Sequence, residues 1–142
     1  MAQQVRGLGV QTFQFPDATS LRPGKGQRYF EVTIREGLEL NDNEIRLVIA
    51  NQQPISKVGL CAGSGGDYLQ QMIEEGCQVF ITGDVKYHLA LSAKEAGITL
   101  IDPGHFGTEK FFAPDFAKQL SAFAGSKVEI LVTKFDQNPF TA

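Results

Sequence analysis

Histidine and glutamate side chains stand four residues apart in segment 104–109, which reads Gly-His-Phe-Gly-Thr-Glu. If this turn is helical, His105 and Glu109 share one face, because residues four apart are neighbours on a helix surface. An imidazole nitrogen and a carboxylate oxygen could then bind one divalent cation, with zinc, iron, nickel, manganese and magnesium as candidates. The alternative is a surface histidine beside a glutamate that stabilises a helix N-terminus.

A second pair with the same spacing lies earlier in the chain, where Asp84 precedes His88 by four residues. On spacing alone, the favoured interpretation is that Asp84 caps the following helix, which is a common role for aspartate. The alternative is that Asp84 and His88 support a metal site or transfer a proton beside it.

A glycine-rich turn, formed by Gly63, Ser64, Gly65 and Gly66, opens a predicted helix directly after an apolar run. Backbone amides at a helix N-terminus favour anions, so this turn is a candidate phosphate loop. It lacks the lysine of a P-loop and the full dinucleotide-binding fingerprint. A tight turn from strand to helix explains the glycines equally well.

These segments need a scaffold, and the hydrophobic pattern predicts one. Short apolar strands are predicted at 57–61, 77–81, 98–101 and 127–133, with helices at 67–75, 86–96 and within 108–123. This alternation predicts an α/β fold, with a mostly parallel sheet and helices on both faces. Ligands bind beyond the carboxyl ends of parallel strands, so we expect the three segments to converge at one edge of the sheet.

The first part of the sequence has a less regular hydrophobic pattern. Residues 1–54 are predicted to form an irregular lead-in with edge strands, and residues 55–142 the α/β half-domain that carries the site. Alternating residues predict strands at 29–34 and 45–50, and residues 22–27 read as an exposed loop.

Composition excludes several classes of protein. The net charge of −3 argues against an extended nucleic-acid-binding surface, because such a surface needs a basic face. No apolar run approaches the ~20 residues of a membrane helix, and the N-terminus lacks the apolar core of a signal peptide. The two cysteines, Cys61 and Cys77, are expected to be buried free thiols, which fits a cytoplasmic location.

Three segments together resemble a known family. Residues 57–65, 79–88 and 101–109 are similar, in order and spacing, to the C-terminal region of the NIF-three-like family. Members of that family are also labelled GTP cyclohydrolase 1 type 2 homologues. The resemblance covers residues 54–140 and is weaker over residues 7–53.

The resemblance implies a dinuclear metal centre in a ring-shaped hexamer. It implies that His105 and Glu109 are metal ligands, with Asp84 and His88 lining the same cleft. In the family, a His-His-Pro motif and an aspartate from the N-terminal half complete the centre, whereas this sequence has two histidines in all and no His-His pair. We therefore expect a homo-oligomer or a separate N-terminal half to complete the site, and weak metal binding by the chain alone.

Three functions are consistent with this sequence. The favoured one is a metal-dependent hydrolase that acts on a nucleotide or another phosphate-bearing substrate. The alternatives are a non-catalytic interaction or scaffold module, and a metal store or chaperone. The sequence also contains eleven phenylalanines, several of them near helix or chain ends, such as Phe111, Phe112 and Phe140. They predict an exposed apolar surface where the missing N-terminal half would pack, and hence self-association or aggregation.

Overall fold

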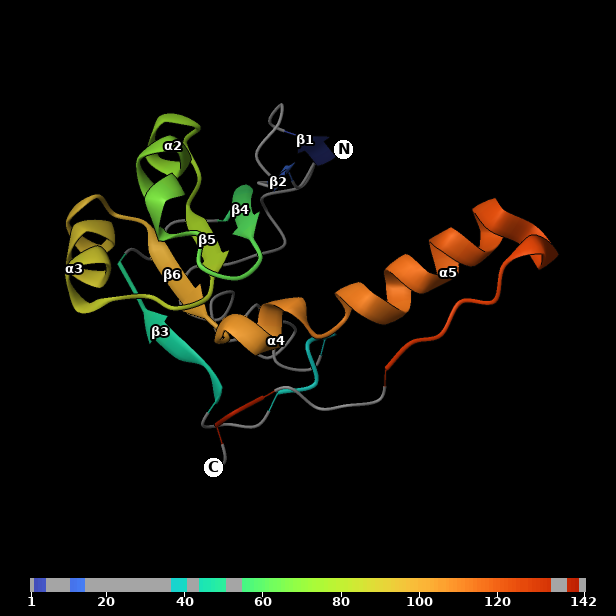
Figure 1. The fold of residues 1–142 in the computed structure, drawn as a ribbon. Coiled ribbons are helices and arrows are strands. Elements are labelled where there is room, and N and C mark those ends of the chain that lie inside the picture. The colour runs from blue at the N-terminus through green and yellow to red at the C-terminus, as the bar shows by residue number, and fades with distance from the viewer. Residues whose placement is uncertain are drawn as a thin grey trace.

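A mixed six-stranded sheet forms the centre of the computed structural model, which describes residues 2–4, 11–14, 37–40, 44–50, 55–133 and 138–140. The strand order is β1-β2-β4-β5-β6-β3. Figure 1 labels these strands, which are β1 (Ala2–Gln4), β2 (Gln11–Gln14), β3 (Arg46–Val48), β4 (Lys57–Cys61), β5 (Val79–Thr82) and β6 (Thr99–Asp102).

The three central strands are parallel, as the sequence predicted. β4 pairs with β5 and β5 with β6 in parallel register, whereas β2 pairs with β4, and β3 with β6, in antiparallel register. All four residues of β5 are buried, as are all four of β6. This two-sided burial explains why these strands are continuous apolar runs. The α/β fold with a mostly parallel centre is therefore confirmed.

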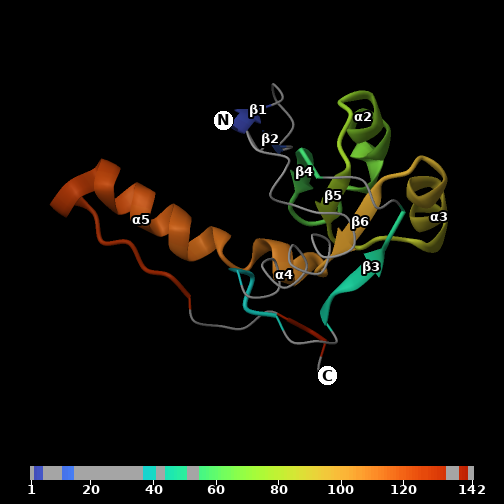
Figure 2. The same ribbon diagram turned by 180° about the vertical axis from the view of Figure 1, so that it is seen from behind.

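Two helices connect the central strands and pack on one face of the sheet. They are α2 (Leu69–Glu74), which follows the short 3-10 turn η3 (Gly66–Tyr68), and α3 (Tyr87–Glu95). The strands β4, β5 and β6 follow one another across the sheet, so right-handed crossovers place consecutive helices on the same side. Figures 1 and 2 show this arrangement from opposite directions, with α2 and α3 together on one side of the sheet, whereas the sequence predicted helices on both faces.

The sheet separates two apolar clusters, because successive side chains of a strand point to opposite faces. One cluster joins Phe80 and Leu100 of the sheet to Met72 of α2 and Ala93 of α3. The other contains Val58, Val79, Ile81, Ile101 and Ile55. Both cysteines are free and buried, as predicted, and burial raises the pKa of each thiol.

The chain beyond β6 forms two further helices, α4 (His105–Glu109) and α5 (Phe112–Ala124). Both ribbon views show α5 extending away from the sheet (Figures 1 and 2). The strand predicted at 127–133 is wrong. Gly125–Lys127 is the 3-10 turn η4, and residues 128–133 belong to no strand of the described sheet. A strand needs a neighbouring strand edge, and this segment runs beside α5 instead (Figure 1).

Strands from the first 54 residues join both edges of the sheet, with β1 and β2 at one edge and β3 at the other. β3 lies within the strand predicted at 45–50, whereas the strand predicted at 29–34 and the loop at 22–27 lie outside the described residues. The division after residue 54 stays a prediction. Within the described ranges, none of the helices has the length and apolar content to span a membrane.

Candidate metal centre

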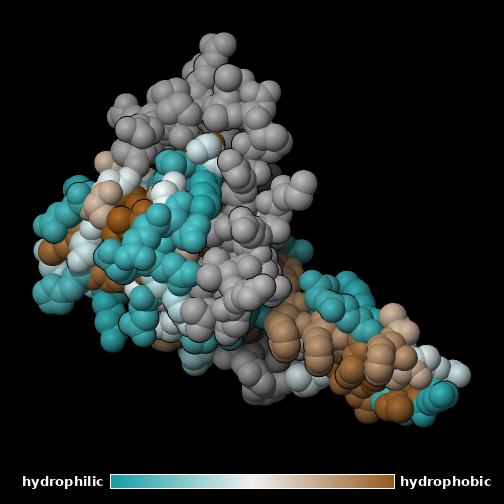
Figure 3. Space-filling model, turned by 90° about the horizontal axis from the view of Figure 1, so that it is seen from above, coloured by the Kyte–Doolittle hydropathy of each residue, from teal (hydrophilic) through white to brown (hydrophobic). Residues whose placement is uncertain are grey.

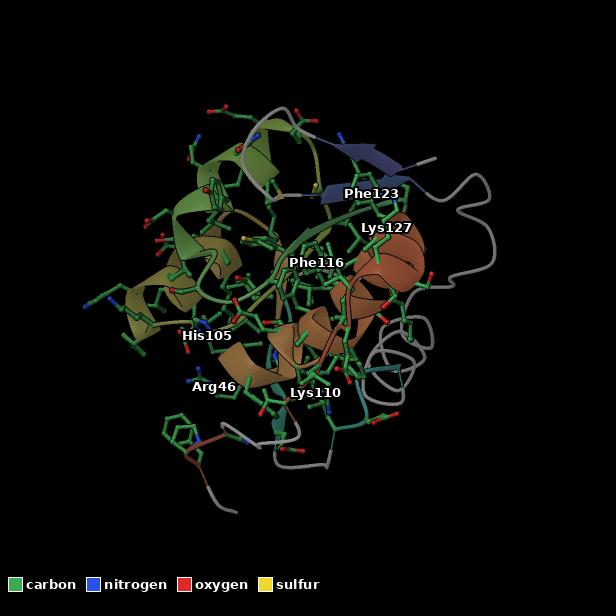
Figure 4. All side chains as sticks on the ribbon, turned by 45° about the vertical axis from the view of Figure 1, so that its right-hand side comes forward. Arg46, His105, Lys110, Phe116, Phe123 and Lys127 are labelled. Atoms are coloured by element: carbon green, nitrogen blue, oxygen red, sulfur yellow. The ribbon has the colours of Figure 1, made fainter. Side chains whose placement is uncertain are left out.

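The residues predicted to do chemistry meet at the carboxyl ends of β5 and β6. Asp84 lies in the loop after β5, and His105 opens α4 just after β6. Asp84 Oδ2 is 2.6 Å from His105 Nδ1, and His105 Nε2 is 3.3 Å from Glu109 Oε2. The three side chains form a row in which the imidazole is flanked by two carboxylates. The predicted approach of His105, Glu109 and Asp84 is thus confirmed. Figure 4 labels His105 at the start of α4.

Helix α4 places His105 and Glu109 on one face, since its five residues bring the first and the last together. The alternative interpretation, in which Glu109 stabilises a helix N-terminus, is wrong, because Glu109 is the last residue of α4. The side chains of His105 and Glu109 are about half exposed, at 50% and 49%. Glu109 therefore ends α4 with its carboxylate directed at the imidazole of His105.

Asp84 does not cap a helix, which corrects the favoured interpretation from spacing. Helix α3 begins at Tyr87, and its N-terminal cap, Lys86, makes no capping hydrogen bond through its side chain. Asp84 instead adopts a left-handed backbone with φ 57°, which costs about 1 kcal/mol for a residue that carries a Cβ. Such conformations gather at functional sites, and here the carboxylate is aimed at His105.

The hydrogen bond from Asp84 fixes the electronic character of the imidazole. Asp84 accepts the Nδ1 proton, so the Nε2 lone pair of the neutral imidazole faces the Glu109 carboxylate. Two electron-rich atoms repel each other unless positive charge lies between them. The hydrogen bond to Asp84 raises the pKa of His105, the nearby charges of Glu109 and Asp84 raise it further, and partial burial opposes the rise. Either a proton on Nε2 or a metal cation between Nε2 and the Glu109 carboxylate supplies this positive charge.

Gly63, in the loop after β4, leaves the space that the His105–Glu109 pair occupies. A Cβ at this position would clash with Glu109 Oε1 and lie 3.1 Å from His105 Nε2. Gly63 also has φ +64°, a conformation that favours glycine. The glycine-rich turn therefore borders the candidate metal centre and forms one wall of it.

Replacing Gly63 with alanine is expected to disrupt the centre beyond its effect on the fold. The left-handed backbone alone costs about 1–2 kcal/mol of stability with a Cβ present. Gly76→Ala is the matched control, because Gly76 has φ +70° and nothing within 4 Å of its Cβ position. Thermal unfolding should show similar losses for both variants. Zinc affinity, measured by titration, should fall only in Gly63→Ala. Equal zinc affinities in the two variants would show that the Glu109 carboxylate beside Gly63 does not bind the metal.

Asp102, which the sequence analysis did not single out, ties the loops of the site together. Its side chain is 2% exposed, and it accepts hydrogen bonds from the Val85 amide at 3.0 Å and the Gly104 amide at 2.9 Å. Arg46 of β3 pairs with the same carboxylate. Val85 follows Asp84, and Gly104 precedes His105. Asp102 therefore holds the two backbone segments that bring Asp84 and His105 into contact.

Gly83 allows these two loops to approach closely. A Cβ there would lie 2.8 Å from backbone atoms of Gly104 and His105, which have no flexible end that could move aside. The sequence signal for this arrangement was an aspartate that ends an apolar strand, directly before Pro103 and Gly104. A carboxylate at the end of a buried strand needs donors, and neighbouring loop amides supply them.

Internal hydrogen bonds occupy two amides of the candidate phosphate loop. The Gly63 amide donates to Thr108 Oγ1 and the Gly65 amide to Thr82 Oγ1, both at 2.8 Å. The Thr82 hydroxyl donates in turn to the Gly63 carbonyl at 3.1 Å. These bonds favour the alternative interpretation, a tight turn from β4 into η3. Phosphate binding by Gly63, Ser64, Gly65 and Gly66 stays a prediction.

His88 lies in the first turn of α3 and is exposed. Its ring meets that of Tyr87 edge to face, with 5.6 Å between the ring centroids. Among the described contacts, His88 touches neither Asp84 nor His105. A direct role beside the cation is therefore less supported for His88 than for Asp84.

The donors fit one side of a divalent cation. Two ligands bound ~2.0–2.1 Å from one tetrahedral ion are about 3.3 Å apart, as His105 Nε2 and Glu109 Oε2 are. Over the described ranges, His, Cys, Asp and Glu side chains form no group of three that could hold a metal. A cation bound by this pair would therefore need further ligands from outside the described residues.

The structure is that of an α/β protein with a histidine–carboxylate pair at the carboxyl edge of the parallel strands. Comparison with known families agrees with this description. Residues 24–139 match the family described as Duf34/NIF3 (NGG1p interacting factor 3). The chain belongs to this family, as its resemblance in three segments predicted.

Curated relatives carry the name GTP cyclohydrolase 1 type 2 homolog. The Bacillus subtilis relative is 30% identical over 115 residues, which are 79% of this chain and 30% of that protein. The Streptococcus pneumoniae relative is 37% identical over 92 residues, which are 63% of this chain and 34% of that protein. The chain thus spans about a third of the length of the curated relatives it matches.

A solved structure, that of Staphylococcus aureus protein SA1388, superimposes on this chain with a TM-score of 0.77 at 26% sequence identity. The match covers 94% of this chain and 36% of the S. aureus chain. The fold described above is therefore the fold of one part of a larger relative.

Proposed function

We propose that this chain contributes a half-site to a dinuclear metal centre, with His105 Nε2 and Glu109 as ligands. Asp84 orients the imidazole and keeps its Nδ1 protonated. The observation that carries the proposal is the row Asp84–His105–Glu109, with 2.6 Å and 3.3 Å between successive side chains. Zinc, iron, manganese, nickel and magnesium are the candidate cations.

The proposed activity is hydrolysis of a nucleotide or another phosphate-bearing substrate in the cytoplasm. A bound divalent cation would supply Lewis acidity and a means of activating water. The residues of this chain would position the ligands of that cation. Asp84 fixes the tautomer of His105, Gly63 leaves room for the Glu109 carboxylate, and Asp102 keeps the two loops in contact.

The remaining ligands are proposed to come from a second polypeptide or from further copies of the chain in a hexameric ring. This part of the proposal follows from the half-site, since two protein donors leave most of a coordination shell to be filled. The relatives, which are about three times as long as the matched region, have the chain length to supply such ligands.

Phosphate release from a panel of nucleotides, measured with added manganese or zinc, tests the hydrolase proposal. We expect release that a chelator abolishes and that Glu109→Gln reduces at least about 10- to 100-fold, as loss of metal-site residues does. Glu95→Gln is the matched control, because Glu95 ends α3 as Glu109 ends α4 and has no part in the site.

Two results would count against hydrolysis. Phosphate release that persists in chelator, or that Glu109→Gln leaves at the wild-type rate, would show that the activity does not depend on this metal site. Intact metal binding without release from any nucleotide would favour a metal store or chaperone. The scaffold alternative predicts a protein partner whose binding is unaffected by chelator.

A further inference from the structure

An apolar helix face and a hollow lie outside the metal centre in the described part of the chain. The face belongs to α5, where Phe112, Phe116 and Phe123 are exposed and hydrophobic residues gather along the projecting helix (Figure 3). A projecting face does not enclose a small ligand. The hollow lies between α3 and β3 and has a volume of about 250 Å³. Small-molecule sites are concave and have volumes of ~300–1,000 Å³, so the hollow suits a ligand at the small end of this range.

This hollow, the α3 pocket, has an apolar floor. Val48 of β3, Leu100 of β6 and Ala90 of α3 line it. Leu100 is buried in the apolar cluster on the helix-covered face of the sheet, and Val48 and Ala90 pack against that cluster. Helix α3 contacts β6 and the edge strand β3, beside which it lies in both ribbon views (Figures 1 and 2). The packing of the sheet therefore fixes the floor, and the pocket is preformed.

Two cations and an aromatic ring stand at the rim of the pocket. Arg46, Lys86 and Tyr87 line it and are exposed, Arg46 at 68% and Tyr87 at 72%. Asp102 offsets the charge of Arg46, whose guanidinium retains further N–H donors. The ammonium group of Lys86 makes no ion pair with any described residue. Lys86 thus leaves the pocket with net positive charge, although the whole chain has a net charge of −3.

We propose that the α3 pocket binds the nucleoside monophosphate part of a nucleotide. The base lies on the apolar floor beside Tyr87, and the phosphate meets Arg46 and Lys86. An uncharged apolar ligand would leave the cations without a partner, and a free inorganic anion would leave the floor and the ring in water. A base that carries a phosphate matches both, because bases stack on aromatic rings and phosphate accepts charge-assisted hydrogen bonds. The choice of a nucleotide as this aromatic anion rests on the proposed function.

One loop serves both the pocket and the metal centre. Asp84 directs its carboxylate to the metal centre, whereas the next two residues, Val85 and Lys86, line the pocket. Asp102 accepts the hydrogen bond of the Val85 amide and pairs with Arg46, so one buried carboxylate anchors both places. A nucleotide held in the pocket is therefore kept at the loop that orients the metal ligands. The pocket thus has the role of a substrate-positioning site.

NMR titration of the chain with AMP, in the presence of a chelator, tests the proposal. We expect the amide signals of Val48, Ala90 and Leu100 to shift. AMP should bind at least about tenfold more tightly than adenosine or ribose 5-phosphate, since each of these occupies one half of the pocket.

Two variants separate the phosphate contact from the base contact. Lys86→Gln should weaken AMP binding about tenfold and leave adenosine binding unchanged, because it removes a charge-assisted contact to the phosphate. Tyr87→Leu should weaken AMP and adenosine binding by the same factor, about fivefold or more, because it removes the stacking ring. Both side chains are exposed, and that of Lys86 makes no capping hydrogen bond, so these changes spare the fold.

Lys94→Gln is the control for charge, because Lys94 is exposed on the same helix and does not line the pocket. Phe123→Leu is the control for the ring, because Phe123 is 91% exposed on α5. Glu109→Gln should bind AMP like the wild type, since the titration contains no free metal.

Three results would overturn the proposal. They are an absence of AMP binding at millimolar concentrations, AMP binding that Lys86→Gln and Tyr87→Leu leave unchanged, and equal affinities for AMP and inorganic phosphate, which indicate a non-specific anion patch. Metal-dependent phosphate release without AMP binding at the pocket would reject the pocket alone. AMP binding without phosphate release from any nucleotide would support the pocket and reject the hydrolase.

Discussion

Replacing His105 with alanine should weaken zinc binding by roughly a hundredfold or more, measured by calorimetric titration of the chain. The wild-type chain is expected to bind zinc weakly and to purify largely metal-free. A structural zinc site with four protein ligands gains ~10–16 kcal/mol, so two donors supply about half of that. The corresponding dissociation constant lies between about 1 μM and about 0.2 mM.

The loss in His105→Ala follows from the ligands that remain. Without the imidazole, Glu109 is the only proposed ligand, and a single carboxylate leaves the cation almost fully hydrated. The other histidine of the chain provides the control. His88 is exposed and contacts the Tyr87 ring, so His88→Ala should bind zinc like the wild type.

Asp84→Asn separates orientation from ligation. The amide can still contact Nδ1, but it removes the negative charge that stabilises the Nδ1–H tautomer. We expect a loss of affinity of about 10- to 100-fold, smaller than or equal to that of His105→Ala. Submicromolar zinc binding that survives His105→Ala, or an equal loss in His88→Ala, would show that the metal binds elsewhere.

Local patterns predicted the scaffold well where burial dictates them. The strand at 57–61 was placed to the residue, and those at 77–81 and 98–101 within two residues, because central strands must be apolar on both faces. The pattern at 127–133 is also apolar, yet it forms no strand. Its residues Val128, Leu131 and Val132 are exposed, and a strand pattern does not reveal whether a partner edge is available.

The candidate site was predictable in part. The four-residue spacing of His105 and Glu109, with a strand before it, was sufficient to bring them together. The role of Asp84 could not be predicted in this way, because helix capping already explains an aspartate that precedes a helix. The partner of Asp84 is 21 residues away, and only the parallel register of β5 and β6 makes them neighbours.

Asp102→Ala is expected to destabilise the fold by about 3–5 kcal/mol, the usual cost of removing one partner from a buried charged network. The Val85 and Gly104 amides would lose their acceptor, and each unsatisfied buried group costs about 1–3 kcal/mol. Arg46 adds little to this figure, because its side chain is 68% exposed and solvent screens the pair. For a chain of this size, the melting temperature should fall by roughly 10–20 °C.

Asp67→Ala is the control for this measurement, since Asp67 is exposed in the 3-10 turn η3 and its loss should change stability by no more than about 0.5 kcal/mol. Asp102→Asn tests positioning apart from folding. Its amide keeps the shape but retains one acceptor oxygen, so one of the two loops loses its hydrogen bond. Because these loops carry Asp84 and His105, zinc affinity should fall in Asp102→Asn while the chain stays folded at 25 °C by circular dichroism. A folded Asp102→Asn protein with wild-type zinc affinity would show that Asp102 stabilises the sheet without placing the metal ligands.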